Sequence, residues 1–586
     1  MTDQTHPLTE SALARLFSDP EITGEAVAFS LPGGATLYES GEAADHLYFV
    51  RAGRLAAIRH EEGMDPHFLG IIRPGEPVGE MAMIAGTQHS AKVVALRDSE
   101  ILALPRAAFF QAADRDSRVM VELARLMILR TRQSADKLSV GDPSVFGFIG
   151  LTRDLKLMPQ VQALAHTIRR LGYTVTVLGA EAQTATPEWF SNTELCHDFV
   201  LYVAEAKEHG WKAVVGRQSD RLFLVARGET EPNLTEPITL PDPLVTQGLV
   251  DLILIQRPVC LRPSGSQAWL DAVDVARLFH IRDKDQAHYD RMARHLTGMA
   301  VGLVLSGGGA RAYAHIGAIK ALHEHGTPID FVCGASMGAV IAAALAMDWP
   351  DAEIDQRIRK AFVDSSPLDD IDFPMIAMTR GDKVNERLNE HFDDQEIADL
   401  WLPFFCVSSN LTAGAYHLHN TGNLRKALRA SISLPGILPP VIFNKQVLVD
   451  GAVMKNLPAD VMRSLHRGPI VAVDVSRARG LSEHDVERPE SVWRWLWSGK
   501  WRQGPPIVAL LMRAATVSTS RDLIASREAS DVLVLPNLSN IDIRNWEAFD
   551  PAVAAGHAAM REALAKLHHP VTDLRRRPSL SDFSLA

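Results

Sequence analysis

A serine between two glycines is the residue of this sequence best suited to nucleophilic chemistry. Ser336 stands in "FVCGASMGAV", residues 331–340, at the centre of Gly334-x-Ser336-x-Gly338. An apolar run precedes it and an alanine-rich run follows it, so the pattern predicts a strand, a sharp turn and a helix. Such a turn presents the hydroxyl at a sheet edge, where the start of the helix favours negative charge. Taken alone, the pentapeptide is equally explained by a tight turn that needs small residues.

An acyl-transfer nucleophile also needs hydrogen-bond donors for the oxyanion, and a glycine triplet upstream can supply them. Gly307, Gly308 and Gly309 follow a short apolar strand pattern and precede a helical pattern. Residues without side chains leave their backbone N–H groups open to one point. A phosphate cradle is the other use of such a loop, but the spacing G-x-G-x-x-G is absent.

The candidate base is an aspartate at the end of another predicted strand. Asp450 ends "QVLVD" and is followed by Gly451 and Ala452. A plain Asp-Gly turn is the alternative explanation. A carboxylate with a pKa of about 4 accepts a serine proton poorly, but burial raises that pKa. The order glycine triplet, G-x-S-x-G and D-G-A predicts a Ser-Asp pair, and no histidine has an evident place as a third member.

These residues lie in the third of three regions that differ in their patterns. Residues 298–570 alternate apolar strand patterns with helical ones, which predicts an α/β domain that carries the three motifs. Residues 145–297 show the same alternation and predict an α/β middle domain; they lack a P-loop signature. Residues 571–586 are charged and polar, and we expect a disordered tail.

The first region, residues 10–135, has short alternating runs separated by glycine turns, for example "HLYFVRAGRLAAI". Alternation with period two and regular glycine punctuation predicts an antiparallel β-barrel. Helical patterns flank it at residues 9–18 and 119–138. The predicted fold class is therefore multidomain, with one β-barrel and two α/β regions.

Length and composition fit this division. The chain has 586 residues, enough for three or four domains, and its 60 basic and 71 acidic residues give a net charge of −11. That charge does not favour nucleic-acid binding. Four dispersed cysteines without metal-ligand spacing suggest a reducing, cytoplasmic location, and neither a signal pattern nor a membrane-spanning run is present. We expect no metal or cofactor. The sequence is compatible with a homo-oligomer and leaves the oligomeric state undecided.

The third region resembles the patatin-like phospholipases, and most closely those of the neuropathy target esterase type. The segments that carry the resemblance are "AVGLVLSGGGARAYAHIGAIKALHEHG", "GASMGAVIAAALAM", "RASISLPGILPPV" and "VLVDGAVMKNLPADVMR". The resemblance implies metal-free serine hydrolysis of acyl esters of phospholipids or lysophospholipids. It implies that Ser336 is the nucleophile, Asp450 the base, and Gly307–Gly309 with Arg311 the oxyanion segment. Ala312 stands where the family usually has glycine, which leaves a weak or inert patatin fold, acting as nucleotide sensor or scaffold, as the alternative.

The first region resembles a cyclic-nucleotide-binding domain through "RPGEPVGEMAMIAGTQHSAKVVAL". In that family a Gly-Glu pair, here Gly79 and Glu80, holds the cyclic phosphate and the ribose, and an arginine nine residues further on neutralises the phosphate. His89 stands at that position, and Lys92 follows three residues later. Histidine lacks the guanidinium fork and is only partly charged near neutral pH, although Lys92 can act as a point charge. The pattern favours a docking or autoinhibitory module over a nucleotide sensor.

Four tryptophans close together raise the question of membrane contact. Trp493, Trp495, Trp497 and Trp501 are interleaved with basic residues. Tryptophan favours the bilayer interface and basic residues attract anionic lipids, so a peripheral membrane contact is one interpretation. Packing in a core, over the cleft or in a dimer contact is the alternative.

Overall fold

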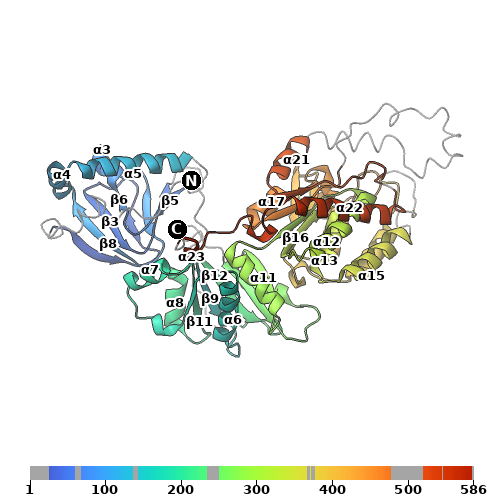
Figure 1. The fold of residues 1–586 in the computed structure, drawn as a ribbon, viewed down its shortest axis with the longest axis horizontal. Helices are drawn as coiled ribbons and strands as arrows, with labels where there is room; N and C mark the ends of the chain where they lie inside the picture. Colours follow the sequence, from blue (N-terminus) through green and yellow to red (C-terminus); the bar gives the residue numbers. More distant parts are fainter. Residues whose placement is uncertain are drawn as a thin grey trace.

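The computed structural model of the chain describes residues 25–59, 67–135, 143–233, 250–365, 370, 376–476, 519–543 and 545–583. They form three parts in chain order, each built on β-sheet (Figure 1). The helix expected over residues 9–18 and the tryptophans between 493 and 501 lie outside these ranges. In the part of the chain that is described, no helix is both long and apolar enough to cross a membrane.

The N-terminal part consists of two four-stranded antiparallel sheets, in the orders β1-β8-β3-β6 and β2-β7-β4-β5. Alternate side chains point inward, as Leu47 and Leu104 do, which is why the period-two pattern predicted this architecture. The elements are β1 (Val27–Leu31), β2 (Thr36–Tyr38), β3 (His46–Ala52), β4 (Leu55–Arg59), β5 (His67–Ile72), β6 (Pro77–Val78), α3 (Glu80–Ala85), β7 (Lys92–Ala95), β8 (Ser99–Pro105), α4 (Arg106–Arg115) and α5 (Arg118–Ala135).

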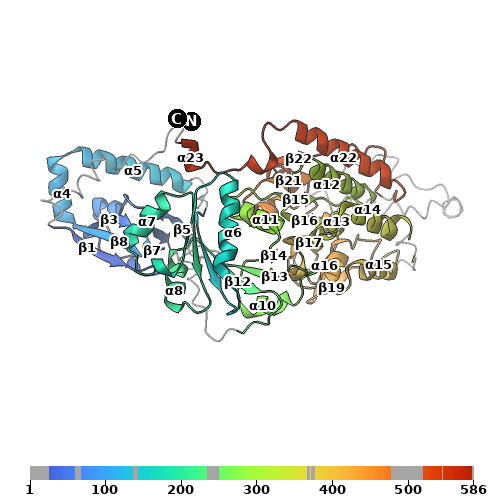
Figure 2. The ribbon, with the colours of Figure 1, turned by 60° about the horizontal axis from the view of Figure 1, so that its bottom comes forward.

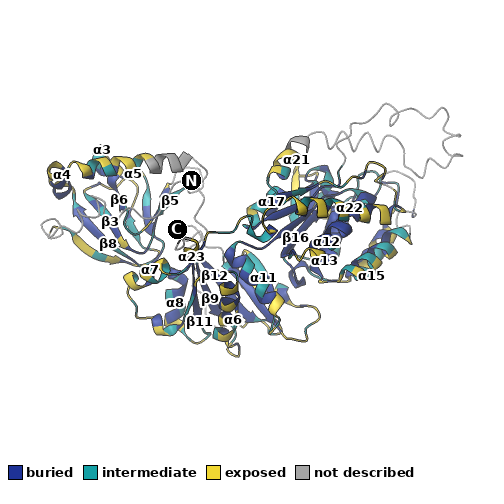
Figure 3. Cartoon of the chain, viewed as in Figure 1, coloured by how far each residue is buried: buried dark blue, intermediate teal, exposed yellow. Residues whose placement is uncertain are grey.

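The middle part is a six-stranded parallel sheet with the order β10-β11-β9-β12-β13-β14. Helices cover both faces, α6 and α11 on one, and α7, α8 and α10 on the other (Figure 2). Its strands are buried on both sides and therefore read as continuous apolar runs (Figure 3). The elements are β9 (Val145–Gly150), α6 (Leu157–Arg170), β10 (Val175–Leu178), η1 (Ala180–Ala182), α7 (Pro187–Leu195), β11 (Phe199–Ala204), α8 (His209–Gln218), β12 (Arg221–Arg227), β13 (Val250–Gln256), α10 (Ser266–Ala272), β14 (Arg277–Arg282) and α11 (Gln286–Thr297).

The third part is an eight-stranded sheet with the order β19-β20-β17-β16-β15-β21-β22, and β18 also pairs with β17. Helices again cover both faces. Its strands are β15 (Gly302–Leu305), β16 (Phe331–Ala335), β17 (Phe404–Asn410), β18 (Ala415–His419), β19 (Val441–Phe443), β20 (Gln446–Val449), β21 (Ile470–Val473) and β22 (Val532–Val534). Its helices are η2 (Gly309–Tyr313), α12 (Ala314–Glu324), α13 (Met337–Ala346), α14 (Asp351–Ile358), the π-helix η3 (Arg359–Val363), α15 (Asp382–Phe392), η4 (Ile397–Asp399), α16 (Leu424–Ser431), η5 (Gly451–Val453), α17 (Ala459–Leu465), α21 (Thr519–Glu528), α22 (Phe549–Ala565) and η7 (Val571–Asp573). The last helix, α23 (Leu580–Phe583), lies beside the middle part (Figure 1).

Strand register brings two distant parts of the chain to one level of this sheet. The parallel strand β16 pairs Ala335 with Val407 of β17, and the antiparallel strand β20 pairs Val449 with Ser409 of the same strand. The residue that follows each of the two strands therefore comes level with the middle of β17. Those residues are Ser336 and Asp450.

Buried ion pairs and hydrogen bonds join the three parts. Arg97 of the barrel forms ion pairs with Glu194 and Asp220 of the middle part. Further along the chain, Arg294 of α11 forms a two-point ion pair with Asp330, whose carboxylate also accepts a hydrogen bond from the N–H of Val301.

The prediction of a disordered C-terminal tail is wrong for residues 571–583. The chain returns from α22 to the middle part, where the hydroxyl of Tyr173 donates to the carbonyl of Arg577. The N–H of Leu580 donates to Asp198 over 2.7 Å. The guanidinium of Arg576 also lies over the ring of Tyr173. The composition of the tail suggested disorder because its polar groups find their hydrogen-bond partners in the folded middle part, far away in the sequence.

Candidate active site

Ser336 occupies a strained turn between β16 and α13. Its φ of 52° and ψ of −132° lie in a region that side-chain-bearing residues rarely adopt. The two flanking glycines are needed for space, because a Cβ at Gly334 would come within 2.5 Å of the Gly338 backbone. A Cβ at Gly338 would in turn lie 2.5 Å from the carbonyl oxygens of Leu305 and Ser306. This strand, turn and helix are the arrangement that the sequence pattern predicted.

The hydroxyl of Ser336 donates a hydrogen bond of 2.6 Å to Oδ2 of Asp450. The other carboxylate oxygen, Oδ1, accepts the N–H of Ala452 over 2.8 Å. Asp450 is almost fully buried, and burial raises its pKa to about 6 although both hydrogen bonds oppose that rise. The carboxylate is thus a stronger base than an exposed aspartate and is already aligned on the hydroxyl.

The backbone N–H of Ser336 is engaged elsewhere. It donates to the hydroxyl of Ser431 over 3.0 Å, and that hydroxyl donates to the carbonyl of Val407 over 2.7 Å. The nucleophile's own amide is therefore not free to stabilise an oxyanion. Ser431 was not singled out as a site residue from the sequence, although it lies in "RASISLPGILPPV", one of the segments that carried the family resemblance.

The three glycines of the triplet differ in the hydrogen bonds that their backbone N–H groups make. The N–H of Gly307 points at the side-chain and main-chain carbonyls of Asn456, over 3.1 and 3.3 Å. For the N–H groups of Gly308 and Gly309 the described residues provide no hydrogen-bond acceptor. Gly309 has a φ of +56°, and a Cβ there would lie 2.2 Å from the carbonyl oxygen of Ile543.

Arg311 and Ala312 lie beside the glycine segment, and their side chains are directed away from it. The guanidinium of Arg311 donates to the carbonyl of Ile541 over 2.7 Å and is buried in that contact. Ala312 is completely buried within the apolar core of the third part, so its methyl group packs into that core. The departure from glycine at Ala312 therefore gives no reason to expect an obstructed site.

Histidines near this edge of the sheet support the structure. His315 is fully buried, its Nε2 lies 2.8 Å from the carbonyl of Ser306, and burial lowers its pKa to about 4. His419 is bonded to Ser408, and burial lowers its pKa to about 3. No histidine among the described residues hydrogen-bonds to either member of the Ser-Asp pair.

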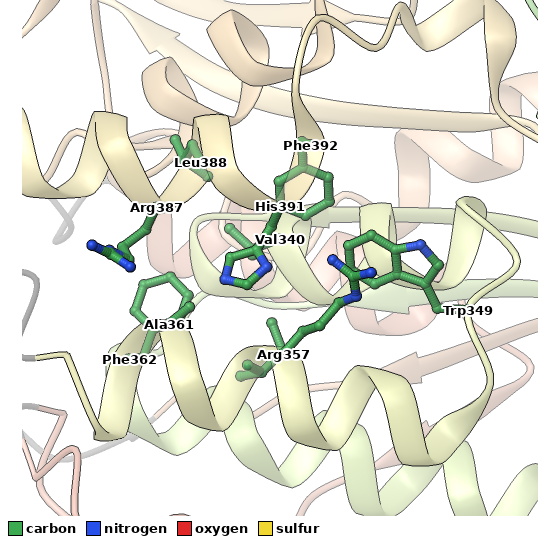
Figure 4. A pocket seen from close by; sticks show the side chains of 10 residues that line it. Val340, Trp349, Arg357, Ala361, Phe362, Arg387, Leu388, His391 and Phe392 are labelled. Atoms are coloured by element: carbon green, nitrogen blue, oxygen red, sulfur yellow. The ribbon is translucent and has the colours of Figure 1, made fainter.

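A cavity lies one helical turn beyond the nucleophile, between α13, α14, η3 and α15 (Figure 4). Val340, Trp349, Phe362 and Phe392 contribute to its mostly apolar lining. His391 also lines it, and neither of its ring nitrogens has a hydrogen-bond partner among the residues that the structure describes. Neither Ser336 nor Asp450 borders this space, so it is not the reaction site itself.

The predicted nucleotide residues of the barrel are only partly brought together. Gly79 and His89 are neighbours, and the imidazole of His89 stacks on Tyr38 with ring centroids 3.6 Å apart. Burial lowers the pKa of His89, which favours its neutral form. Glu80 is buried beside Gly79, whereas Lys92 is engaged at the surface in an ion pair of 2.8 Å with Glu39. Of the two residues predicted to face a cyclic phosphate, His89 is thus stacked on Tyr38 and Lys92 is paired with Glu39.

In the middle part, the start of α6 carries an anion supplied by the chain itself. The carboxylate of Glu205, just after β11, accepts the N–H groups of Leu157 and Met158 over 3.0 Å each. A helix start that follows a parallel strand is where phosphate groups bind in nucleotide-binding folds. In this chain the carboxylate of Glu205 occupies the start of α6, in keeping with the missing P-loop signature.

Among the described residues, no cluster of three or more His, Cys, Asp or Glu side chains could hold a metal ion.

Fold and site together define a class of multidomain protein in which a jelly-roll-like barrel precedes a patatin-like α/β domain. The family model described as "Patatin-like phospholipase" matches residues 303–463, and "Cyclic nucleotide-binding domain" matches residues 28–116. A third model, "Neuropathy Target Esterase family P-loop like domain", matches residues 151–301. An uncharacterized NTE family protein of Mycobacterium tuberculosis is 31% identical over 551 residues, which cover 91% of each chain. The chain belongs to the NTE (neuropathy target esterase) family.

Animal proteins match over a similar stretch of this chain. Patatin-like phospholipase domain-containing protein 6 of Homo sapiens is 27% identical over 571 residues, 86% of this chain and 42% of its own length. The neuropathy target esterase of Drosophila melanogaster is 28% identical over 562 residues, 84% of this chain and 39% of its own. These matches confirm the resemblance and the fold class inferred from the sequence. The names of the relatives support a lipid esterase.

Proposed function

We propose that the chain is a serine esterase that hydrolyses acyl esters of phospholipids or lysophospholipids through a dyad of Ser336 and Asp450. The observation that carries the proposal is the 2.6 Å hydrogen bond between Ser336 Oγ and a buried Asp450 whose pKa is raised to about 6. Serine is a weak nucleophile unless an adjacent base takes its proton. This pair provides such a base in the ground state.

The reaction follows from these groups. Asp450 accepts the hydroxyl proton while Ser336 Oγ bonds to the ester carbonyl carbon, and the carbonyl oxygen becomes an oxyanion facing the N–H groups of Gly308 and Gly309. When the tetrahedral intermediate collapses, the carbon–oxygen bond to the alcohol breaks and the alcohol takes the proton from Asp450. A water molecule then repeats the sequence on the acyl-enzyme and releases the fatty acid. In comparable sites each oxyanion donor contributes roughly 3–4 kcal/mol.

The lipid nature of the substrate rests on relatives. The matching family is described as patatin-like phospholipase, and two of the similar proteins are named phospholipase domain-containing protein and neuropathy target esterase. The geometry of the dyad itself suits any acyl ester. The acyl and headgroup classes therefore belong to this proposal and need a direct assay.

A fluorophosphonate probe tests the proposal on the intact chain. We expect the probe to label Ser336, identified by mass spectrometry of the modified peptide, and the unlabelled protein to release fatty acid from lysophosphatidylcholine. Heat-denatured protein is the control, because labelling needs the aligned pair. A folded protein that takes up no probe at Ser336 would leave the scaffold alternative standing.

The pH dependence of the reaction should report the raised pKa of Asp450. Only the ionised carboxylate can accept the serine proton, so kcat/KM should fall as the pH drops through about 6. Below that point the decline should approach tenfold per pH unit, as for one titrating base. Initial rates on a neutral ester between pH 4.5 and 8, with circular dichroism to monitor folding, provide the measurement. Activity that stays constant down to pH 4.5 would contradict the assignment of the base.

We further propose that the barrel acts as a docking or autoinhibitory module, with little or no affinity for cyclic nucleotides. Cyclic AMP and cyclic GMP should bind weakly or not at all, because His89 is stacked on Tyr38 and Lys92 is paired with Glu39. His89→Arg should strengthen any binding, since it supplies the guanidinium. Calorimetry measures the cyclic-nucleotide affinity of the unmodified chain and of His89→Arg. Lys92→Ala is the control, and its affinity should equal that of the unmodified chain. Sub-micromolar affinity in the unmodified chain would overturn the proposal.

A further inference from the structure

Asn456 connects the loop that carries the base to the loop that faces the nucleophile. It lies six residues beyond Asp450, between η5 and α17, and is half-buried. Its side-chain carbonyl accepts the N–H of Gly307 over 3.1 Å, and its main-chain carbonyl lies 3.3 Å from the same nitrogen. The single N–H of Gly307 is thus shared between two carbonyl oxygens of one residue.

Gly307 is confined between Asn456 and the nucleophile. A methyl group added at Gly307 would lie 2.8 Å from Asn456 Oδ1 and 2.9 Å from Ser336 Cβ. The residue before it, Ser306, is also fixed: its N–H donates to Val473, and its carbonyl lies 2.8 Å from His315 Nε2. The contact with Asn456 thus fixes the start of the glycine loop, and the N–H of Ala310, which donates to the carbonyl of Ile543, fixes its end.

We infer that Asn456 is a positioning residue of the esterase reaction, which holds Gly307 so that the N–H groups of Gly308 and Gly309 face the carbonyl attacked by Ser336. The inference rests on the proposed function. Oxyanion donors act only when they are held in place before charge develops, and a displacement of about 1 Å can cost about 10²-fold in rate. Because the ester in its ground state makes little use of these donors, their displacement should lower kcat and leave KM nearly unchanged.

The first test is Asn456→Ala in the full chain, assayed on a water-soluble ester and with the fluorophosphonate probe. We expect kcat and the labelling rate each to fall about 10- to 100-fold, with KM within about threefold of the unmodified value. Asn423→Ala is the matched control, because Asn423 Oδ1 accepts the N–H of Lys426 over the same 3.1 Å at the far end of α16. That control should keep its kcat.

The second test is Asn456→Asp, which keeps an oxygen for the Gly307 N–H and so should preserve the fold, the melting temperature and KM. Its carboxylate places a second negative charge on the other side of Gly307 from Ser336. Ionisation of Asp450 then becomes less favourable, so the acid limb of the pH profile should move to higher pH. That shift reports the added charge, whereas kcat on the alkaline plateau reports the oxygen acceptor, and it should stay within about threefold of the unmodified value while Asn456→Ala loses about 10- to 100-fold. This variant decides the matter if the alanine variant does not fold.

The outcomes separate the two proposals. If the unmodified chain hydrolyses esters and Asn456→Ala keeps kcat and labelling within about twofold, the inference fails and the proposed function stands. A folded Asn456→Asp variant that loses as much kcat above its acid limb as Asn456→Ala is expected to lose overturns the inference as well. If the folded, unmodified chain neither hydrolyses esters nor reacts with the probe, the proposed function fails and the inference falls with it.

Discussion

Replacing Ser336 with alanine is expected to lower the rate of ester hydrolysis by about 10³-fold or more, because the atom that forms the acyl-enzyme bond is removed. The fold should survive, since the change deletes one hydroxyl from a turn held by its neighbours. The N–H of residue 336 would still donate to Ser431, and Gly334 and Gly338 would still close the turn. Fatty-acid release and fluorophosphonate labelling, measured beside a thermal melt, provide the readouts.

Ser464→Ala is the matched control for that experiment. Ser464 lies on α17 of the same part of the chain and donates only to the carbonyl of Val461, away from the dyad. It should hydrolyse esters at the unmodified rate. A Ser336→Ala protein that retains more than a few per cent of the unmodified rate would show that another residue is the nucleophile.

Replacing Asp450 with asparagine should lower activity by a similar factor and at the same time stabilise the fold at neutral pH. An amide cannot accept the serine proton at any accessible pH, so a loss of about 10³-fold or more is expected. The asparagine can still accept the N–H of Ala452 through its carbonyl oxygen, the contact that the Oδ1 atom of Asp450 makes over 2.8 Å. The local turn should therefore persist.

The stabilisation follows from the raised pKa of Asp450. Folding raises that pKa from 3.8 to about 6, so the folded state favours the protonated form. The stability associated with Asp450 is therefore fully present below about pH 4, and it is lost as the pH rises through about 6. Above that pH the ionised carboxylate costs on the order of 2–3 kcal/mol, a cost that asparagine does not carry.

Thermal melts at pH 4.5 and 7.5 measure this effect. The melting temperature of Asp450→Asn should exceed that of the unmodified chain at pH 7.5, and the difference should shrink at pH 4.5. Ser336→Ala is the control, because it is equally inactive but retains the buried carboxylate. An Asp450→Asn protein that hydrolyses esters normally would refute the dyad. A gain in melting temperature over the unmodified chain that is no larger at pH 7.5 than at pH 4.5 would refute the raised pKa of Asp450.

Local patterns in the sequence were sufficient for the fold class and for the chemical candidates. Period-two alternation predicted the antiparallel barrel, and buried apolar runs such as Val145–Gly150 predicted parallel strands. The G-x-S-x-G spacing predicted the turn at Ser336, because a close approach of backbone to backbone tolerates only glycine there. Each of these features shows in a short stretch of residues, because the alternation, the apolar run and the small residues recur within one strand or turn even where the partner segment is distant.

Composition and family analogy were less reliable where a side chain's partner is distant. The polar tail beyond residue 570 read as disordered, yet it binds to Tyr173 and Asp198 of the middle part. Arg311 belongs to the predicted oxyanion segment, and the sequence did not reveal that its guanidinium holds the carbonyl of Ile541. A long side chain can turn either way from one backbone position, and only its packed surroundings determine which way it turns.

The sequence alone determined which residues could react: the strand, turn and helix around Ser336, the glycine triplet and the aspartate that follows a strand. Tertiary structure decided which of them meet. Ser336 and Asp450 are 114 residues apart, and Gly307 and Asn456 are 149 apart. Both pairs form because the order and register of the strands bring separate chain segments to one edge of the sheet. No local pattern encodes those pairings, since strand order is selected by burial over the whole domain.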